Sequence, residues 1–281
     1  MPSLRARLDK PMRPPNEVSF DDFTKYFPFA PAALCVKECA RLTEIRRYDC
    51  PGPILDVGCG DGLFARIAFK DAEIWGIDVD AKEGGWALAS RAYTQIILGD
   101  IARAKLPQEF FATCIANCSL EHVPDLDAAL ATIRGSLEPG GRAYLFVPNR
   151  DWASWFASVR LLRALGLEGA GRALQDSVDR VFKHRHLYDE AEWRRRVEKA
   201  GLVVERVDPV LSTATTVTFE LLLLPSLLGL VNKKMTTRWT NFPRLRRWAA
   251  RPAYELVRAA LEAEGESAPT AELLVVCSRP E

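Results

Sequence analysis

Short apolar runs alternate with stretches of helical periodicity through the middle of the chain. Five runs are short and apolar enough for buried strands, at 53–57, 73–78, 95–100, 110–117 and 142–148. Helices are predicted between them at 63–69, 84–92 and 126–137. Strands that alternate with helices in this way indicate an α/β fold, with a mostly parallel sheet covered by helices on both faces.

The pattern is less regular towards both ends of the chain. A polar lead-in is predicted at 1–20, helices at 30–47 and 189–200, a helical excursion at 151–183, and strands at 202–207 and 271–277. Three parts are therefore expected. They are an N-terminal arm and cap helix (1–48), a core (49–208 with 269–281) and an apolar and basic insertion (209–268).

The composition is that of an ordinary globular protein. Of the 281 residues, 48% are hydrophobic and 27% are charged, which excludes a disordered or collagen-like chain. The 38 basic and 37 acidic residues leave a net charge of +1, so no global field attracts nucleic acid, and none is expected as a partner. The seven cysteines include no Cys-x-x-Cys pair, and the N-terminus has no apolar signal core. A reduced, cytoplasmic protein is expected.

The strongest chemical signal is a glycine-rich turn between the first strand and the helix after it. The turn reads Asp56-Val-Gly58-Cys59-Gly60-Asp-Gly62, and Leu63 stands where a dinucleotide fingerprint would have its third glycine. Asp56 would repel a pyrophosphate, but it suits a ligand that carries a positive charge. An NAD-dependent oxidoreductase is therefore the less favoured alternative.

Further motifs follow the other strands in order. Asp78 ends the second strand, Gly99-Asp100-Ile101 ends the third, and Asn117 begins the loop after the fourth. With the glycine-rich turn, this series resembles the class I S-adenosylmethionine-dependent methyltransferases, and among them the small-molecule group. The resemblance covers about 50–208 and 271–279. It implies a Rossmann-like mixed sheet of seven strands, in which the last strand is antiparallel and lies beside the fifth.

The resemblance also implies S-adenosylmethionine as the cofactor. In this family the position of Asp78 binds the ribose hydroxyls, that of Asp100 reads the adenine amino group, and Asn117 would close over the cofactor. Carboxylates are compatible with a ligand that has a sulfonium cation and no phosphate. The predicted cofactor-binding residues are Asp56, Gly58, Cys59, Gly60, Gly62, Asp78, Val79, Asp100, Ile101 and Asn117.

Two histidines are candidate general bases. Methyl transfer requires a base only if the acceptor group has a high pKa, as a hydroxyl does. His122 follows the fourth strand, and His186 precedes Asp189, the predicted N-cap of a helix. The alternatives are that His122 orients a loop and that His186 makes a contact at the helix start. Quinone-biosynthesis O-methyltransferases, which bind a metal, have a carboxylate where this chain has Cys118, so no metal is expected.

The substrate is expected to be selected by the N-terminal stretch and the late insertion. Tyr26, Phe27 and Phe29 are candidates to cap the acceptor pocket, with core packing as the alternative. The insertion has one charge, Glu220, between 210 and 231. Eight basic residues follow between 232 and 258, opposed by Glu255 alone and interleaved with aromatic residues.

Three interpretations of the insertion compete: a membrane-spanning helix, an element at a membrane surface, and a lid over an apolar pocket. The last two are favoured and are compatible with each other. Binding of RNA by the same basic and aromatic stretch is a further alternative. We expect O-methylation of a hydrophobic or amphiphilic small molecule, such as a lipid, isoprenoid, quinone or polyketide-like compound. Peripheral contact of 210–258 with the inner membrane face is part of this expectation.

Methylation of nitrogen or carbon in a soluble metabolite, and a non-catalytic cofactor-binding scaffold, remain as alternatives.

Overall fold

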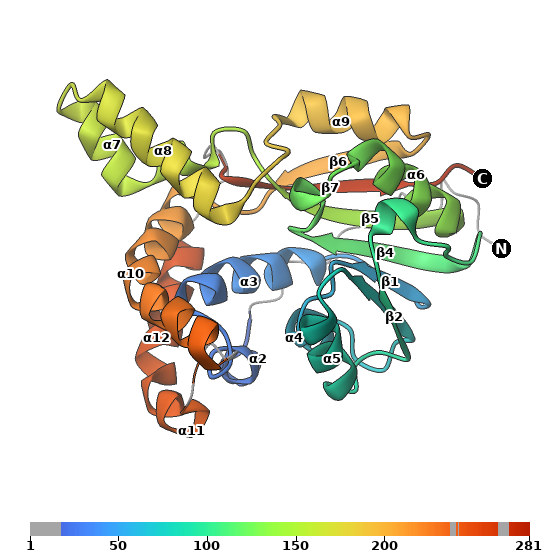
Figure 1. Cartoon of the computed structure of the whole chain (residues 1–281), viewed down its shortest axis with the longest axis horizontal. Helices are drawn as coiled ribbons and strands as arrows, with labels where there is room; N and C mark the ends of the chain where they lie inside the picture. The colour runs from blue at the N-terminus through green and yellow to red at the C-terminus, as the bar shows by residue number, and fades with distance from the viewer. Residues whose placement is uncertain (1–17, 237–239, 241, 264–269) are drawn as a thin grey trace.

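A seven-stranded mixed sheet forms the centre of the molecule (Figure 1). The computed structural model describes residues 18–236, 240, 242–263 and 270–281. The strands are β1 (Ile54–Val57), β2 (Ile74–Asp78), β3 (Gln95–Leu98), β4 (Phe111–Asn117), β5 (Leu137–Pro148), β6 (Val203–Pro209) and β7 (Glu272–Ser278). Their order is β3-β2-β1-β4-β5-β7-β6, and β7 runs antiparallel to both of its neighbours. The predicted Rossmann-like sheet, with its last strand antiparallel beside the fifth, is confirmed.

The sheet divides two apolar cores. Successive side chains of a strand point to opposite faces, so Ile54 and Ile115 join one core while Leu55 and Cys114 join the other. Every residue of β1 is buried, which explains its unbroken apolar run. The helices α4 (Leu63–Ala68), α5 (Ala81–Ala89), α6 (Leu126–Ser136) and α9 (Glu190–Lys199) belong to this α/β part. Two of them, α6 and α9, cover the core that contains Leu55.

The helix boundaries follow local signals in the sequence. The carboxylate of Asp189 accepts a hydrogen bond of 2.9 Å from the backbone N–H of Glu192, so its predicted role as an N-cap is confirmed. Ser19 caps α2 (Phe20–Tyr26) in the same way, a helix that the apolar pattern alone did not predict. The fifth strand begins at Leu137 rather than at 142, because Leu137 pairs with Phe111 before the register shifts.

The N-terminal helices and the insertion pack together as one helical layer. It contains α2, α3 (Ala32–Ile45), α10 (Thr213–Thr236), α11 (Pro243–Arg246), the short helix η4 (Arg247–Ala249) and α12 (Ala250–Glu262) (Figure 1). Along α10, Phe219 is buried, and the Ser226 hydroxyl accepts a hydrogen bond from the backbone N–H of Ala33 on α3. A separate hairpin of α7 (Ala157–Ala164) and α8 (Glu168–Phe182) projects from the molecule.

The lengths and apolarity of the helices bear on the interpretations of the insertion. In the described ranges, no helix has the length and apolarity that crossing a membrane requires. Residues 1–17 of the predicted lead-in, together with Arg238 and Trp239 of the basic stretch, lie outside the described residues.

Candidate functional site

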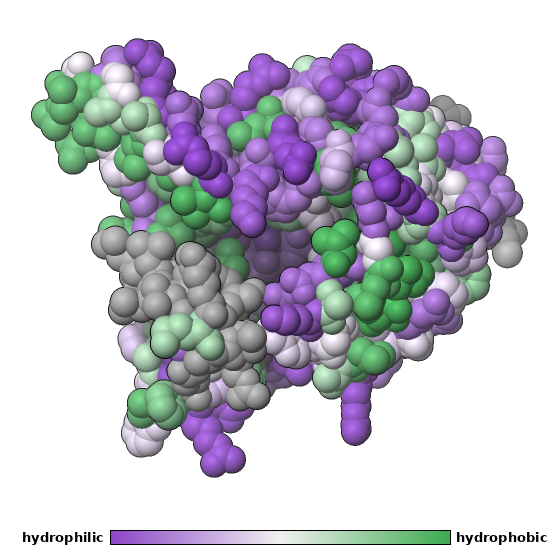
Figure 2. All heavy atoms as spheres, viewed as in Figure 1, coloured by the Kyte–Doolittle hydropathy of each residue, from purple (hydrophilic) through white to green (hydrophobic). Residues whose placement is uncertain are grey.

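A cavity of about 450 Å³ opens at the carboxyl ends of β1 to β4. In a doubly wound sheet, ligands bind at this end of the strands. The cavity is lined by Val57, Gly58, Ile77, Asp78, Val79, Gly99, Asp100, Ile101, Cys118, Ser119, His122, Val123 and Pro124. Five of the predicted cofactor-binding residues are therefore in its wall, namely Gly58, Asp78, Val79, Asp100 and Ile101. Five others are not in this wall: Asp56, Cys59, Gly60, Gly62 and Asn117. Figure 2 shows that this face of the molecule is hollowed near its middle and carries hydrophilic side chains there.

The glycine-rich turn forms one side of the cavity because the loop after β4 packs directly against it. Gly58 has φ +75°, and a Cβ at this position would lie 2.3 Å from the Cβ of Ser119. The Ser119 hydroxyl donates a hydrogen bond of 2.6 Å to the carbonyl of Val57. The tight approach of these two loops requires glycine at position 58.

Two carboxylates at the strand ends hold the loops that line the cavity. Asp78 accepts hydrogen bonds from the backbone N–H groups of Gly60, at 2.9 Å, and Asp80, at 2.8 Å. Asp100 accepts one from the N–H of Ala102, at 3.0 Å. Both aspartates lie in the cavity wall. They are therefore placed to accept hydrogen bonds from a bound ligand as well.

Asp56 has different surroundings from the other two aspartates. Its side chain is buried below the glycine-rich turn, where it accepts a hydrogen bond of 2.7 Å from the Tyr93 hydroxyl. Burial raises its pKa to about 7, although the Tyr93 bond opposes the rise. Asp56 thus bonds to Tyr93 and does not line the cavity, and its predicted direct contact with the cofactor stays a prediction. Nothing in the apolar pattern or the motifs marked Tyr93.

A buried ionic cluster, also absent from the sequence analysis, lies between α3 and the ends of β4 and β7. The Arg41 guanidinium makes two bonds to the Glu272 carboxylate, at 2.6 and 2.8 Å, and one to Glu38 at 2.7 Å. Lys37 lies 3.3 Å from Glu272. Burial alone would raise the pKa of Glu272, but Arg41 and Lys37 outweigh it and lower the pKa to about 2.

The ionic cluster contacts Cys118, which lines the cofactor cavity, and Asn117, the last residue of β4. Arg41 donates a hydrogen bond of 2.9 Å to the sulfur of Cys118, which lines the cavity. The Asn117 side-chain N–H₂ donates to Glu38 at 3.0 Å, while its buried oxygen has no partner among the described residues. Asn117 is thus held by the cap helix, and its predicted contact with the cofactor stays a prediction.

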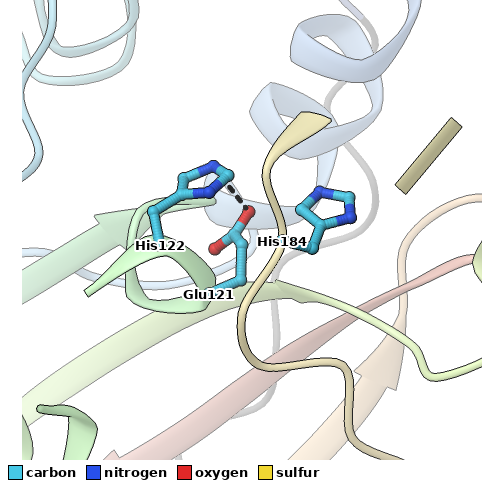
Figure 3. A group of neighbouring side chains, drawn as sticks. All are labelled: Glu121, His122 and His184. Atoms are coloured by element: carbon cyan, nitrogen blue, oxygen red, sulfur yellow. Dashed lines mark ion pairs between the residues drawn. The ribbon is translucent and has the colours of Figure 1, made fainter. Parts of the chain in front are cut away.

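His122 is the predicted base that lies in the cavity wall (Figure 3). Its Nδ1 is 3.2 Å from the backbone carbonyl of Lys183, and a carbonyl oxygen only accepts hydrogen bonds. Nδ1 therefore carries the proton and Nε2 has the free lone pair. Burial lowers the pKa of His122 below its usual value, which favours this neutral ring.

Glu121 and His184 lie beside His122 (Figure 3). Oε1 of Glu121 is 3.8 Å from Nε2 of His122, and Oε2 of Glu121 is buried without a hydrogen-bond partner in the described ranges. Burial raises the pKa of Glu121 to about 7. Ligand atoms of the three residues lie within 4.8 Å of one another, a spacing that could hold a metal ion. The expectation that no metal is bound stays a prediction.

His186 has both ring nitrogens engaged and is not in the wall of the cofactor cavity. Its Nε2 donates to the carbonyl of Val123 at 2.9 Å, and its Nδ1 is 3.0 Å from the hydroxyl of Tyr188. The backbone N–H of His186 also donates to the carbonyl of Glu121. His186 thus ties its loop to the loop after β4, and the role of either histidine as a base stays a prediction.

The three aromatic residues predicted to cap the pocket lie in different surroundings. Tyr26 is buried, and its pKa is raised by burial and by the nearby charge of Glu38. Phe27 is buried beneath the guanidinium of Arg246, which lies 4.3 Å from the ring centroid. Phe29 is 42% exposed and borders a different hollow, next to α11. Their role in substrate binding stays a prediction.

Comparisons with known proteins give the chain a family. A family model described as a methyltransferase domain matches residues 30–207. The chain is 37% identical over 91 residues to an uncharacterized methyltransferase of Mycobacterium bovis, an alignment that covers 31% of this chain and 46% of that protein. It is 33% identical over 115 residues to a ubiquinone biosynthesis O-methyltransferase of Dechloromonas aromatica, covering 38% and 48%. The chain thus spans about half the length of these curated relatives.

The fold is shared with a solved enzyme that contains the product form of the cofactor. Phosphoethanolamine N-methyltransferase 2 of Haemonchus contortus, solved with S-adenosylhomocysteine, superposes with a TM-score of 0.54. It is 14% identical, over 87% of this chain and 52% of that one, so the likeness concerns the fold.

The residues around the cavity fit S-adenosylmethionine. Two carboxylates and no lysine or arginine are among the lining residues, which suits a ligand with hydroxyls and a cation and does not suit a pyrophosphate. Asp78 and Asp100 would hold the cofactor here, with the glycine-rich turn beneath it. The family model matches more than half of the chain, so the chain belongs to the class I S-adenosylmethionine-dependent methyltransferases.

Proposed function

We propose that the enzyme transfers a methyl group to a hydroxyl of a hydrophobic or amphiphilic small molecule. The observation that carries this proposal is the free Nε2 lone pair of His122 in the wall of the cofactor cavity. Methyl transfer to a hydroxyl requires a base, whereas an acceptor that is already nucleophilic does not. A neutral histidine held in one tautomer beside the cofactor site supplies that base.

Glu121 supports this role through its charge. When His122 takes the proton of the acceptor, its ring becomes a cation, and the carboxylate of Glu121 lies 3.8 Å from the nitrogen that receives the proton. Because Glu121 is buried, its attraction to the imidazolium is screened less than it would be in water. The pKa of Glu121 is about 7, so Glu121 and His122 can share a proton near neutral pH.

Aromatic rings extend from His122 away from the cofactor cavity. His122 stacks on His184 with centroids 5.6 Å apart, and His184 lies 5.1 Å from Trp152 and 5.8 Å from Phe182. Trp152 and the His184 side chain are buried, so these rings pack on one another and hold the ring of His122 in place.

The relatives support oxygen as the atom that is methylated. Several are named ubiquinone biosynthesis O-methyltransferases, at 28–33% identity over part of their length. S-adenosylmethionine supplies the methyl group on its sulfonium. The chain itself orients the acceptor, removes its proton at Nε2 of His122 and keeps water out of the line of transfer.

A transfer assay with a His122 variant tests the proposal. The full chain is incubated with methyl-labelled S-adenosylmethionine and a cell extract, and label is measured in the organic and aqueous phases. We expect label in the organic phase, and a loss of about 100-fold or more with His122→Gln. The loss should shrink as the pH rises, because the acceptor hydroxyl then ionises without a base.

Two controls separate the possible causes of a loss. His122→Gln should still bind S-adenosylmethionine with nearly the affinity of the wild type, which calorimetry measures. Asp78→Ala should lose binding and transfer together. If His122→Gln transfers methyl groups at the rate of the wild type, or if label enters only small aqueous molecules, the proposed O-methylation of a hydrophobic acceptor is wrong.

A further inference from the structure

The turn that joins α10 to α12 exposes large apolar side chains. Phe242 is 71% exposed, Leu245 is 69% exposed and Trp248 is 86% exposed. Neither α11 nor η4 contains a buried residue. Scattered exposed apolar residues are ordinary, but three within seven positions of one turn form a patch. We call Phe242, Leu245 and Trp248, with the arginines among them, the arginine–aromatic edge.

The arginine–aromatic edge is fixed to the body of the protein although it is exposed. Arg246 lies over the ring of Phe27 at 4.3 Å and donates a hydrogen bond of 2.8 Å to the hydroxyl of Thr240. Ala250, at the start of α12, is fully buried. The turn is thus anchored at its middle and its end, and its apolar side chains face outward from an anchored backbone.

Positive charge surrounds these apolar side chains. Between 242 and 254 the sequence contains four arginines and no acidic residue. Arg244 and Arg247 are exposed and form no ion pair with any carboxylate in the part of the chain that the structure describes. Arg251 pairs with Glu255 at 3.1 Å. The edge therefore combines exposed apolar groups with uncompensated positive charge.

An open hollow of about 650 Å³ lies along the edge. Phe29, Phe242, Pro243 and Leu245 give it an apolar wall, and Arg244 and Arg247 border it. Figure 2 shows hydrophobic and hydrophilic side chains next to each other at the end of the molecule where Figure 1 places α11. An apolar floor with guanidinium groups at its rim matches an amphiphile that has an anionic headgroup.

A second apolar tip lies on the same side of the molecule. At the end of the α7–α8 hairpin, Leu161, Leu165 and Leu167 are exposed. Figure 1 shows this hairpin and α11 at the two ends of the left-hand side of the view.

We propose that the arginine–aromatic edge docks the enzyme on the surface of an anionic lipid bilayer. Tryptophan and phenylalanine enter the headgroup boundary, and arginines bind the lipid phosphates, as in other elements that lie on a membrane without crossing it. This inference is independent of the proposed hydroxyl acceptor, because docking is measured without turnover. It would place a lipophilic substrate next to the enzyme, but it does not require one.

Co-sedimentation of the full chain with vesicles tests the proposal. One set of vesicles contains phosphatidylcholine alone, and the other contains phosphatidylcholine with phosphatidylglycerol. We expect binding to the anionic vesicles at low salt, at least about tenfold tighter than to the neutral ones, and weaker binding as the salt rises. Replacing Arg244 and Arg247 by Ala should weaken it by about 30-fold, because each basic side chain at such a surface adds about a fivefold preference.

Apolar and control variants complete the experiment. Trp248→Ala and Phe242→Ala together should weaken binding to the anionic vesicles by at least about tenfold, since both rings leave water on docking. Trp86→Ala on α5 and Arg66→Ala on α4 change the same residue types elsewhere and should leave vesicle binding unchanged. The side chains at the edge lie outside the cores, so the variants should melt at the temperature of the wild type.

Three outcomes would overturn the proposal. The first is equal binding to neutral and anionic vesicles, and the second is equal losses in the edge variants and the controls. The third is binding to inorganic phosphate or to RNA that depends on Arg244 and Arg247 while vesicles are not bound. That result would mean that the edge binds a free anion or RNA and not a lipid bilayer.

Discussion

Removing the guanidinium of Arg41 should strongly destabilise the protein, because it leaves Glu272 buried without its main partner. Glu272 is fully buried, and its pKa is about 2 instead of 4.5. That difference is about 2.5 pKa units, or about 3 kcal/mol of stability at neutral pH. Breaking a buried ion pair by removing one partner costs a similar amount, about 3–5 kcal/mol. We therefore expect Arg41→Met to lower the free energy of unfolding by about 3 kcal/mol.

The pKa of Glu272 also predicts how the loss of stability in Arg41→Met depends on pH. Because folding lowers the pKa of Glu272, its contribution is complete above about pH 4.5 and is lost as the pH falls towards 2. The difference in stability between the wild type and Arg41→Met should therefore shrink over this range. Urea unfolding followed by circular dichroism, at pH 7 and at several lower values, measures the difference.

Two further variants control for the loss of a large side chain. Arg194→Met removes an exposed arginine on α9 whose partners, Glu190 and Glu198, lie 3.6 and 3.9 Å away, and its effect should be small. Adding Glu272→Gln to Arg41→Met should recover part of the loss, because the unpaired charge is then gone. If Arg41→Met costs no more than Arg194→Met, or if its cost is the same at every pH, the reasoning is refuted.

Three smaller predictions follow from the same geometry. Tyr93→Phe should destabilise the protein by about 1–3 kcal/mol, measured by urea unfolding, because the buried carboxyl of Asp56 loses its hydrogen-bond donor. Because the supporting carboxylate of Glu121 has a pKa of about 7, the transfer rate should begin to fall as the pH drops below about 7, as a pH–rate profile would show. Dialysis against EDTA should leave the rate unchanged; a loss that zinc or manganese restores would instead identify Glu121, His122 and His184 as a metal centre.

The sequence was sufficient to predict the sheet and part of the lining of its cavity. Strands buried on both faces give short unbroken apolar runs, and glycines and carboxylates at their ends mark the rim where ligands bind. Asp78 and Asp100 lie in the cavity wall because they end β2 and follow β3. Asp56 lies inside β1, where alternation points its side chain away from the face of Leu55 and Val57.

The ionic cluster could not be predicted from the sequence for a definite physical reason. Lys37, Glu38 and Arg41 lie on α3 at the spacing of ordinary pairs on a helix surface, and such charges usually face water. Their burial depends on Glu272, more than 200 positions later, and on α10, which covers α3. A contact over that separation leaves no signal in the periodicity of either segment. One signal of burial was available in the sequence. The charges of Lys37, Glu38 and Arg41 interrupt a helix that otherwise has many apolar residues.

The two favoured interpretations of the insertion, a lid and an element at a membrane surface, concern different parts of one helical layer. In α10, Phe219 is buried and Ser226 accepts a hydrogen bond from Ala33 on α3, contacts that a lid would make. The exposed apolar residues belong instead to the turn formed by α11 and η4. The two parts are linked, because Arg246 at the edge lies over Phe27, and Phe27 stacks on Phe23 of α2 at 5.0 Å. Tyr26 of the same helix is close enough to Glu38 for that charge to raise its pKa. Packed side chains therefore connect the arginine–aromatic edge to α2, so the insertion and the N-terminal helices form one continuous unit.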